Sequence, residues 1–262
     1  MKVTDLFIYP IKACRGVRLS RARIVARGFA ADRRYMLIDA VNEFVTQRKR
    51  PELALVSVSL VDGGFELTAP GRAPLRVSET CEDGERVTAR IWGHQGVGVR
   101  HVPGSSWFSE YLGAKVSLVY MPDDHQRAVN PARAAPSDVV SFADGYPFLL
   151  TSEESLAELN RRLPSPIGML RFRPNIVIDG SSPFVEDTFA RVRIGGTTFR
   201  GPKACDRCVV TTIDPETARA HAEPLKTLAT FRQWDGKVWF GMNLIHDAQG
   251  ELAVGDDVTP LT

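Results

Sequence analysis

The residues best suited to chemistry are two cysteines, Cys205 and Cys208, in the short stretch ACDRC. Asp206 and Arg207 stand between them. Two thiols at this spacing can form half of a zinc site or a redox pair, or can pack as small apolar side chains. A single one of them can instead bind a metal as a thiolate. The rest of the sequence must distinguish these uses.

Two of the uses lack supporting residues. A zinc site needs four ligands, and His221 follows Cys208 at the spacing of a third, but the next histidine, His246, is too distant for the usual fourth. A thioredoxin-like pair should open a helix, whereas the Val-Val-Thr-Thr-Ile that follows Cys208 is typical of a strand. The polar neighbours Asp206 and Arg207 disfavour a wholly apolar setting. A single thiolate ligand remains, and we expect Arg207 to lower the pKa of a neighbouring thiol.

Basic residues stand at the ends of several predicted strands. Clustered cations hold a phosphate through charge-assisted hydrogen bonds, and strand ends can converge at one mouth of a barrel. Taken singly, each of these residues is more simply a solvated surface charge. A phosphate site therefore needs a further feature that ties them together. The residues are Lys12 and Arg15, Asp32 with Arg33 and Arg34, and Arg171 and Arg173.

The chain is rich in short segments of β-branched and aromatic residues separated by turn residues, which predicts strands. Their spacing favours barrels or sandwiches over a parallel βαβ sheet. Residues 39–45 and 61–67 are typical of hairpin connections. The predicted strands cover 4–11, 21–27, 34–40, 53–61, 64–69, 86–92 and 115–121.

Two helices are predicted, over residues 105–113 and 151–163. The second opens with Thr151 and Glu154, which resemble a capping box. Its leucines at 156, 159 and 163 form one apolar face, which we expect to pack in the core. Residues 122–141 are polar and rich in proline and alanine, which predicts a long loop.

The composition describes an ordinary globular protein of 262 residues, 44% hydrophobic and 24% charged. A net charge of +2 gives no general attraction to nucleic acid or to a membrane, so neither is expected as a partner. No segment is long and apolar enough to span a bilayer, and the first residues do not form a secretory signal. We therefore expect a cytoplasmic location, where thiols stay reduced. A boundary near residue 94 predicts two domains, 1–94 and 95–262.

Several stretches, taken together and in order, resemble the MOSC family and in particular its amidoxime-reducing branch. The resemblance covers nearly the whole chain. It implies an α+β fold that is mainly β, with a MOSC β-barrel domain, a smaller β-rich N-terminal domain and a few helices. The stretches are YPIKACRG (9–16), DRRYMLI (32–38), DGYPFLLTSEESLAELNRRL (144–163), RFRPNIVIDG (171–180) and CDRCVVTTIDPET (205–217).

The resemblance also implies a molybdenum cofactor. In the family one cysteine of the pair holds the metal, and the matching residue is Cys208, which would be both metal ligand and catalytic residue. Cys205 would then be accessory. Lys12, Arg33 and Arg173 suit the cofactor phosphate, because their charges are positive. The cofactor-binding residues implied by the match are Lys12, Ala13, Arg33, Asp144, Gly145, Tyr146, Arg173, Asn175, Asp206, Arg207 and Cys208.

The activity implied by the resemblance is the reduction of N-hydroxylated compounds such as amidoximes, N-hydroxylamines and N-hydroxylated base analogues. No cysteine follows Cys208, so we expect no iron–sulfur domain in the chain. Electrons would then come from a separate iron–sulfur, flavin or haem protein. The alternative is a sulfur-carrier or cofactor-handling protein, in which Cys205 and Cys208 carry sulfur and hold no resident metal.

Overall fold

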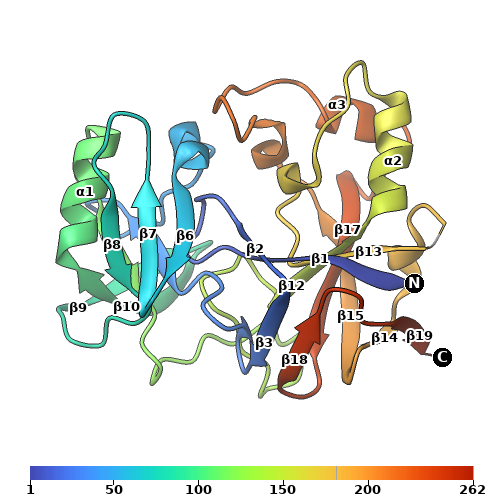
Figure 1. Ribbon diagram of the computed structural model, residues 1–262, viewed down its shortest axis with the longest axis horizontal. Coiled ribbons are helices and arrows are strands. Elements are labelled where there is room, and N and C mark those ends of the chain that lie inside the picture. The colour runs from blue at the N-terminus through green and yellow to red at the C-terminus, as the bar shows by residue number, and fades with distance from the viewer. Residues whose placement is uncertain (181, 262) are drawn as a thin grey trace.

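A computed structural model describes residues 1–180 and 182–261 of the chain. Figure 1 shows two halves side by side, with helix α1 (Val102–Leu112) on one side and helices α2 (Glu153–Arg162) and α3 (Leu225–Leu228) on the other. Strands make up 40% of the residues and helices 16%. The prediction of a mainly β chain with a few helices is therefore confirmed.

The half that contains α2 is built on one large sheet. Its strands pair in the order β19, β14, β15, β17, β12, β13, β1 and β2, and β16 pairs with β17. The strands are β1 (Lys2–Ile8), β2 (Val17–Leu19), β12 (Phe148–Ser152), β13 (Ile176–Asp179), β14 (Arg191–Ile194), β15 (Thr197–Asp206), β16 (Gln233–Trp234), β17 (Lys237–His246) and β19 (Val258–Leu261).

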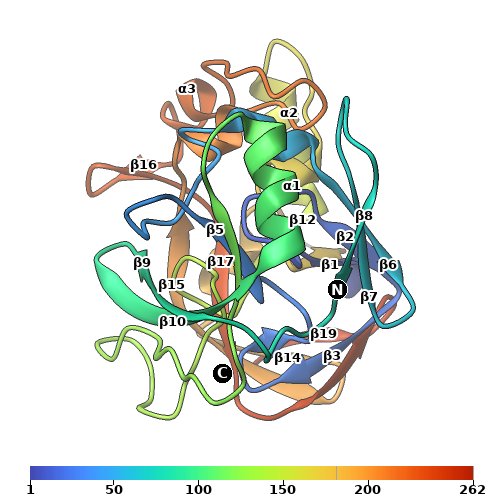
Figure 2. The ribbon, with the colours of Figure 1, turned by 90° about the vertical axis from the view of Figure 1, so that its left-hand side faces the viewer.

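Smaller sheets complete the molecule. One has the order β5, β11, β10, β9, another β6, β7, β8, and a third β18, β3, β4. Figure 2 shows α1 in front of the half that holds the first two of these sheets. The strands are β3 (Arg21–Val25), β4 (Gly28–Phe29), β5 (Tyr35–Ile38), β6 (Ser57–Val61), β7 (Gly64–Thr68), β8 (Leu75–Ser78), β9 (Arg86–Ile91), β10 (His94–His101), β11 (Ser117–Tyr120) and β18 (Gly250–Ala253).

The first strand of the chain lies between β2 and β13 in the large sheet. It pairs antiparallel with β13, with Leu6 opposite Ile176. In Figure 1 the N-terminus accordingly lies on the side of α2. Because of this pairing, the turn that follows β1 and the segment that precedes β13 leave the same edge of the sheet and lie side by side.

Most predicted elements are present, and three local predictions are wrong. Residues 53–61 are not one strand, because Pro51–Leu55 form a single turn of 3-10 helix, η1, before β6 begins. The cap of α2 is Ser152, whose hydroxyl accepts a hydrogen bond from the amide of Ser155, whereas Thr151 lies buried in β12. The hairpins at 39–45 and 61–67 are confirmed by antiparallel pairing across each turn.

The third wrong prediction concerns the segment after Cys208. It is a turn of 3-10 helix, η4 (Val209–Thr212), and not a strand. The hydroxyl groups of Thr211 and Thr212 donate to the carbonyls of Cys208 and Val209, three residues earlier, at 3.0 and 2.7 Å. These local bonds compete with a strand ladder and favour the tight turn.

The apolar face of α2 packs in the core, as predicted. Its three leucines cluster with Phe172, Leu228 and Phe240, and the rings of Phe172 and Phe240 stack with centroids 3.9 Å apart. Residues 122–141 form a long loop, with one isolated bridge between Ala128 and Val139. The remaining 3-10 turns are η2 (Met169–Arg171) and η3 (Val185–Thr188).

Glu186, in η3, is fully buried and provides a test of this packing. One carboxylate oxygen accepts from the hydroxyl of Ser155 at 2.9 Å, and the other has no partner among the described residues. Burial raises the pKa of Glu186. The stabilisation linked to its proton is therefore complete below the pKa of the unfolded chain and is lost as the pH rises through the folded pKa.

We expect Glu186→Gln to be more stable than the wild type at neutral and alkaline pH, by about 1 kcal/mol. The difference should shrink toward pH 4, where the wild-type carboxyl is protonated in both states. Urea unfolding at a series of pH values measures it. Glu251→Gln, at an exposed ion pair with Arg21, is the matched control. Parallel pH profiles for wild type and Glu186→Gln would contradict this view of Glu186.

Candidate functional site

A cleft with a cavity volume of about 160 Å³ brings together every residue implied by the sequence resemblance. Both halves of the molecule contribute to the walls. The predicted residues that line it are Lys12, Ala13, Arg33, Asp144, Gly145, Tyr146, Arg173, Asn175, Asp206, Arg207 and Cys208.

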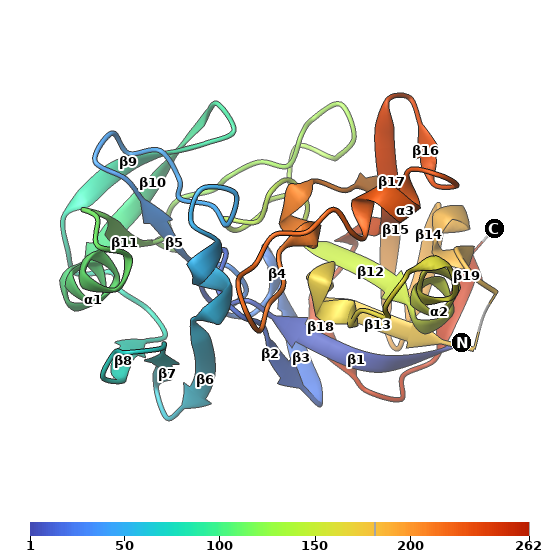
Figure 3. The same cartoon turned by 90° about the horizontal axis from the view of Figure 1, so that it is seen from above.

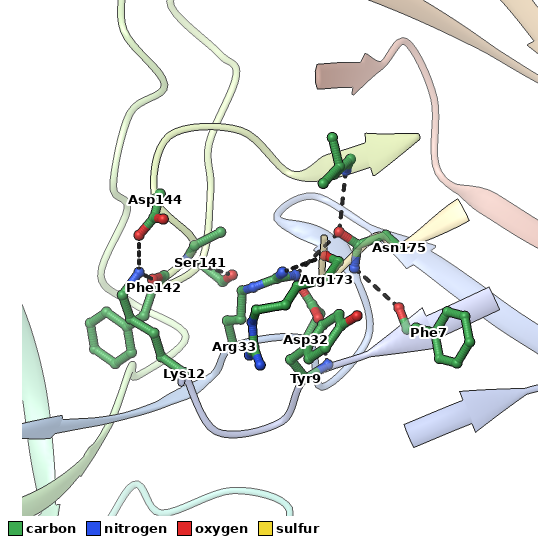
Figure 4. A network of polar contacts seen from close by, with 12 residues as sticks. Phe7, Tyr9, Lys12, Asp32, Arg33, Ser141, Phe142, Asp144, Arg173 and Asn175 are labelled. Atoms are coloured by element: carbon green, nitrogen blue, oxygen red, sulfur yellow. Dashed lines mark hydrogen bonds and ion pairs between the residues drawn. The ribbon is translucent and has the colours of Figure 1, made fainter. Parts of the chain in front are cut away.

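The pairing of β1 with β13 positions one wall of this cleft. Asn175, which precedes β13, is 1% exposed, and its side chain is bonded on three sides. Its amide nitrogen donates to the carbonyl of Phe7 at 3.1 Å, and its amide oxygen accepts from Leu149 N at 3.3 Å. The same oxygen accepts from the Arg33 guanidinium at 3.2 Å. Figure 4 shows this network. Asn175 therefore ties three segments together and orients Arg33.

The ring of Tyr9 carries two guanidinium groups. Arg33 and Arg173 lie 4.5 and 4.3 Å from its centroid, within the range of cation–π attraction. Burial raises the pKa of Tyr9 to about 12, although both arginines oppose this shift. The phenol thus stays neutral, and its hydroxyl donates to the carbonyl of Pro174 at 3.0 Å.

The two arginines differ in how their charge is compensated. Arg33 is paired with buried Asp32 at 2.6 Å, which holds its pKa above the usual range despite burial. Arg173 donates to the carbonyl of Cys14 at 2.7 Å and has no carboxylate partner among residues 1–180 and 182–261. The wall therefore presents one positive charge that the described protein does not neutralise.

Three residues of this wall have backbones in the left-handed region. The φ angles are 74° for Ala13, 49° for Arg33 and 55° for Arg173. Such conformations cost about 1–2 kcal/mol for residues other than glycine and are concentrated at functional sites. The backbone of Ala13 is held by Gln47, whose amide nitrogen donates to the Ala13 carbonyl at 2.6 Å.

Lys12 and Asp144 form an ion pair across the cleft, with Nζ and Oδ1 2.5 Å apart. Lys12 also donates to the carbonyl of Phe142 at 2.8 Å. Burial alone would raise the pKa of Asp144, but the charge and hydrogen bond of Lys12, the hydrogen bond of Trp92 and the charge of Arg33 together hold that pKa well below its usual range. Buried Arg127 donates to the carbonyls of Ser141, Ala143 and Asp144, and so fixes the path of this loop.

All four cysteines are free thiols. Arg207 Nη1 lies 2.9 Å from Sγ of Cys205 and not beside Cys208, and its Nη2 donates to the carbonyl of Phe172 at 2.7 Å. The expectation of a lowered thiol pKa is wrong for Cys205, because burial raises that pKa and outweighs the charge of Arg207. Cys208 lies on the cleft wall as the N-cap residue that precedes η4.

Asp206 also lines the cleft, and two lysines engage its carboxylate. Lys203 and Lys237 pair with its two carboxylate oxygens at 2.5 and 3.3 Å. Asp206 is the last residue of β15 and lies opposite Trp239 of β17. Figure 3 shows β16 and this end of β17 extending from the body of the molecule.

Three of the basic residues noted in the sequence lie outside the cleft. Arg34 pairs with Asp123, Arg171 with Asp214, and Arg15 with Glu216. The structure adds residues that the sequence analysis missed. They are Tyr9, Gln47 and a group at the mouth, Phe44, Arg48 and Trp92. A tryptophan followed by a glycine at the end of the predicted strand 86–92 was a usable signal for the last of these.

Comparison with known families identifies both parts of the chain. Residues 1–115 match the MOSC N-terminal beta barrel domain, and residues 137–259 match the MOSC domain. The chain belongs to the MOSC family. It is similar to mitochondrial amidoxime-reducing component 1 of Homo sapiens, with 32% identity over 98% of this chain and 82% of the relative.

Two other relatives have comparable identity. Mitochondrial amidoxime reducing component 2 of Rattus norvegicus is 32% identical over 98% of this chain and 82% of its own length. The molybdenum cofactor sulfurase of Oryza sativa subsp. japonica is 31% identical over 98% of this chain, which spans only 35% of that relative. Both kinds of protein are thus similar to this chain over 98% of its length.

The donor set of the cleft fits a cofactor that carries a phosphate and a thiolate-bound metal. Arg173 is a buried cation without a carboxylate, and Nε of Arg207 is buried without a partner among the described residues. Cys208 supplies a soft ligand on the same wall. In the described part of the MOSC chain, no group of three or more His, Cys, Asp and Glu side chains could hold a metal by itself. No described helix has the length and apolar character of a membrane span.

The role of Asn175 can be tested by stability. Asn175→Ala leaves the Phe7 carbonyl and the Leu149 amide buried without a partner, so we expect a loss of about 2–4 kcal/mol in the free energy of unfolding. Urea denaturation measures it. Asn130→Ala removes one exposed bond to Ala132 N and should cost less than about 1 kcal/mol. Equal losses in the two variants would refute the conclusion that the Asn175 side chain holds three segments together.

Proposed function

We propose that this MOSC protein is a molybdenum-cofactor-dependent reductase of N-hydroxylated compounds, with Cys208 as the metal ligand. Amidoximes, N-hydroxylamines and N-hydroxylated base analogues are the substrate class. The observation that carries the proposal is the joint presence of uncompensated Arg173 and the Cys208 thiol on one cleft wall. The similarity to amidoxime-reducing components over 98% of the chain supports the choice of reaction.

Different residues bind different parts of the cofactor. Arg173, Arg33 and Lys12 neutralise its phosphate, because guanidinium and ammonium groups form charge-assisted hydrogen bonds with phosphate oxygens. The loop over Asp144, Gly145 and Tyr146 offers backbone groups to the pterin edge. The path of that loop is fixed beforehand by Arg127, so little ordering is needed on binding.

The reaction is a balanced two-electron reduction. The N–O bond of the substrate breaks, an N–H bond forms, and the oxygen leaves as water after two electrons and two protons have been added. When bound, the cofactor metal supplies the two-electron chemistry. We propose that a separate iron–sulfur, flavin or haem protein provides the electrons. The chain's own part is to hold the metal through Cys208 and to position the cofactor.

The decisive experiment measures molybdenum per chain in protein purified from a host that makes the cofactor. We expect stoichiometric molybdenum in the wild type and in Cys205→Ala, because Cys205 is engaged by Arg207 away from the metal position. Cys208→Ala should reduce the molybdenum content at least about tenfold. Its urea unfolding curve should match that of the wild type, since Cys208 is only partly buried.

Turnover completes the test. Molybdenum-loaded wild type should reduce benzamidoxime to benzamidine with reduced methyl viologen as electron source, and Cys208→Ala should not. Retained activity in Cys208→Ala would refute the assignment of the ligand. Absence of molybdenum from all three proteins, with persulfide detected on Cys205 or Cys208, would establish the sulfur-carrier alternative. That alternative is favoured by the similarity to molybdenum cofactor sulfurase over 98% of this chain.

A further inference from the structure

Three residues of the N-terminal half, Phe44, Arg48 and Trp92, form a contact group at the mouth of the cleft, which we term the mouth cluster. All three line the cleft. The rings of Phe44 and Trp92 meet edge to face with centroids 4.8 Å apart, and the guanidinium of Arg48 lies 4.5 Å from the Trp92 ring centroid. The Trp92 indole nitrogen donates to Asp144 at 3.2 Å, which joins the cluster to the opposite wall.

Trp92 occupies a position that its own hairpin does not favour. It stands with Gly93 in the two-residue loop between Ile91 and His94, which pair as the last residues of β9 and the first of β10. Both loop residues have positive φ, 51° and 79°. This is the geometry of a type I′ turn, whose first position favours asparagine, aspartate or glycine. A large ring kept there, 43% exposed, indicates a role other than forming the turn.

Arg48 is a cation without a counter-ion. Its side chain makes the stacking contact with Trp92 and no ion pair with any carboxylate of residues 1–180 and 182–261. Asp144, on the opposite wall, is already paired with Lys12 at 2.5 Å. The mouth of the cleft therefore presents two aromatic rings and a guanidinium that has no carboxylate partner among the described residues. A planar molecule with a negative group is complementary to both features.

We propose that the mouth cluster is the substrate-recognition wall of this protein and that it selects planar N-hydroxylated compounds with an anionic substituent. The inference rests on the proposed reductase function and names the class of substrate within it. A carboxylate or a phosphate meets the requirement equally. The rings of Phe44 and Trp92 contact the planar part of the substrate, and Arg48 contacts the anion.

The test compares two substrates that differ only in charge, benzamidoxime and 4-carboxybenzamidoxime, with reduced methyl viologen as electron source. We expect the wild type to have the higher kcat/KM for the carboxylate. The ratio of the two kcat/KM values should fall about three- to tenfold in Arg48→Gln, and the wild-type preference should weaken as salt is added. Arg76→Gln, a similar exposed arginine on β8 away from the cleft, should keep the wild-type ratio.

A second variant separates recognition from structure. Trp92→Asn suits the type I′ turn, so its stability should equal or exceed that of the wild type, while kcat/KM for both aromatic compounds falls. Unchanged kcat/KM in Trp92→Asn, or an unchanged ratio in Arg48→Gln, would overturn the inference. Loss of molybdenum from Arg48→Gln would also overturn it, because Arg48 would then belong to the cofactor. A molybdenum-loaded wild type that reduces neither compound would refute the reductase function itself.

Discussion

The cleft depends on how two guanidinium groups are kept next to each other inside the protein. Like charges repel, and burial removes the water that would screen them. Here Tyr9 offers its ring to both Arg33 and Arg173, Asp32 neutralises the first, and Asn175 fixes its orientation. The second cation remains uncompensated by the described residues. An anion bound beside it would lower the free energy of the folded state, which makes the wall both a binding site and a source of stabilisation.

The sequence predicted which residues make up the site better than it predicted their backbone conformations. Lys12, Arg33 and Arg173 stand at the ends of strands, so their convergence could be expected once the strands were placed. The family resemblance then indicated which cysteine to single out. Neither source predicted that Ala13, Arg33 and Arg173 share left-handed backbones, because alanine and arginine give no local signal for positive φ. The constraint comes from contacts that are distant in sequence.

The wrong predictions have a common physical origin. Residues 209–213 and 53–55 are β-branched or leucine-rich, which favours strands, yet both form 3-10 turns. In the first, threonine hydroxyls bond to nearby carbonyls, and in the second, Pro51 opens the turn. Similarly, Arg207 is adjacent to Cys208 in sequence, but its side chain contacts Cys205. Local propensity is a weak guide where side chains bond to the backbone or where two partners compete.

The pairing of β1 with β13 also sets the order of events when the chain is made. Leu6 finds its partner Ile176 only after some 170 further residues have been added, since 176 − 6 = 170. The backbone of Met1 and Val3 is in turn bonded to residues 255–258, close to the other end of the described chain. During most of synthesis, β2 is therefore the only one of its two sheet neighbours that is available to β1. The cleft wall that the β1–β13 pairing positions can form only after Ile176 has been synthesised, so any ligand that needs this wall binds after that point.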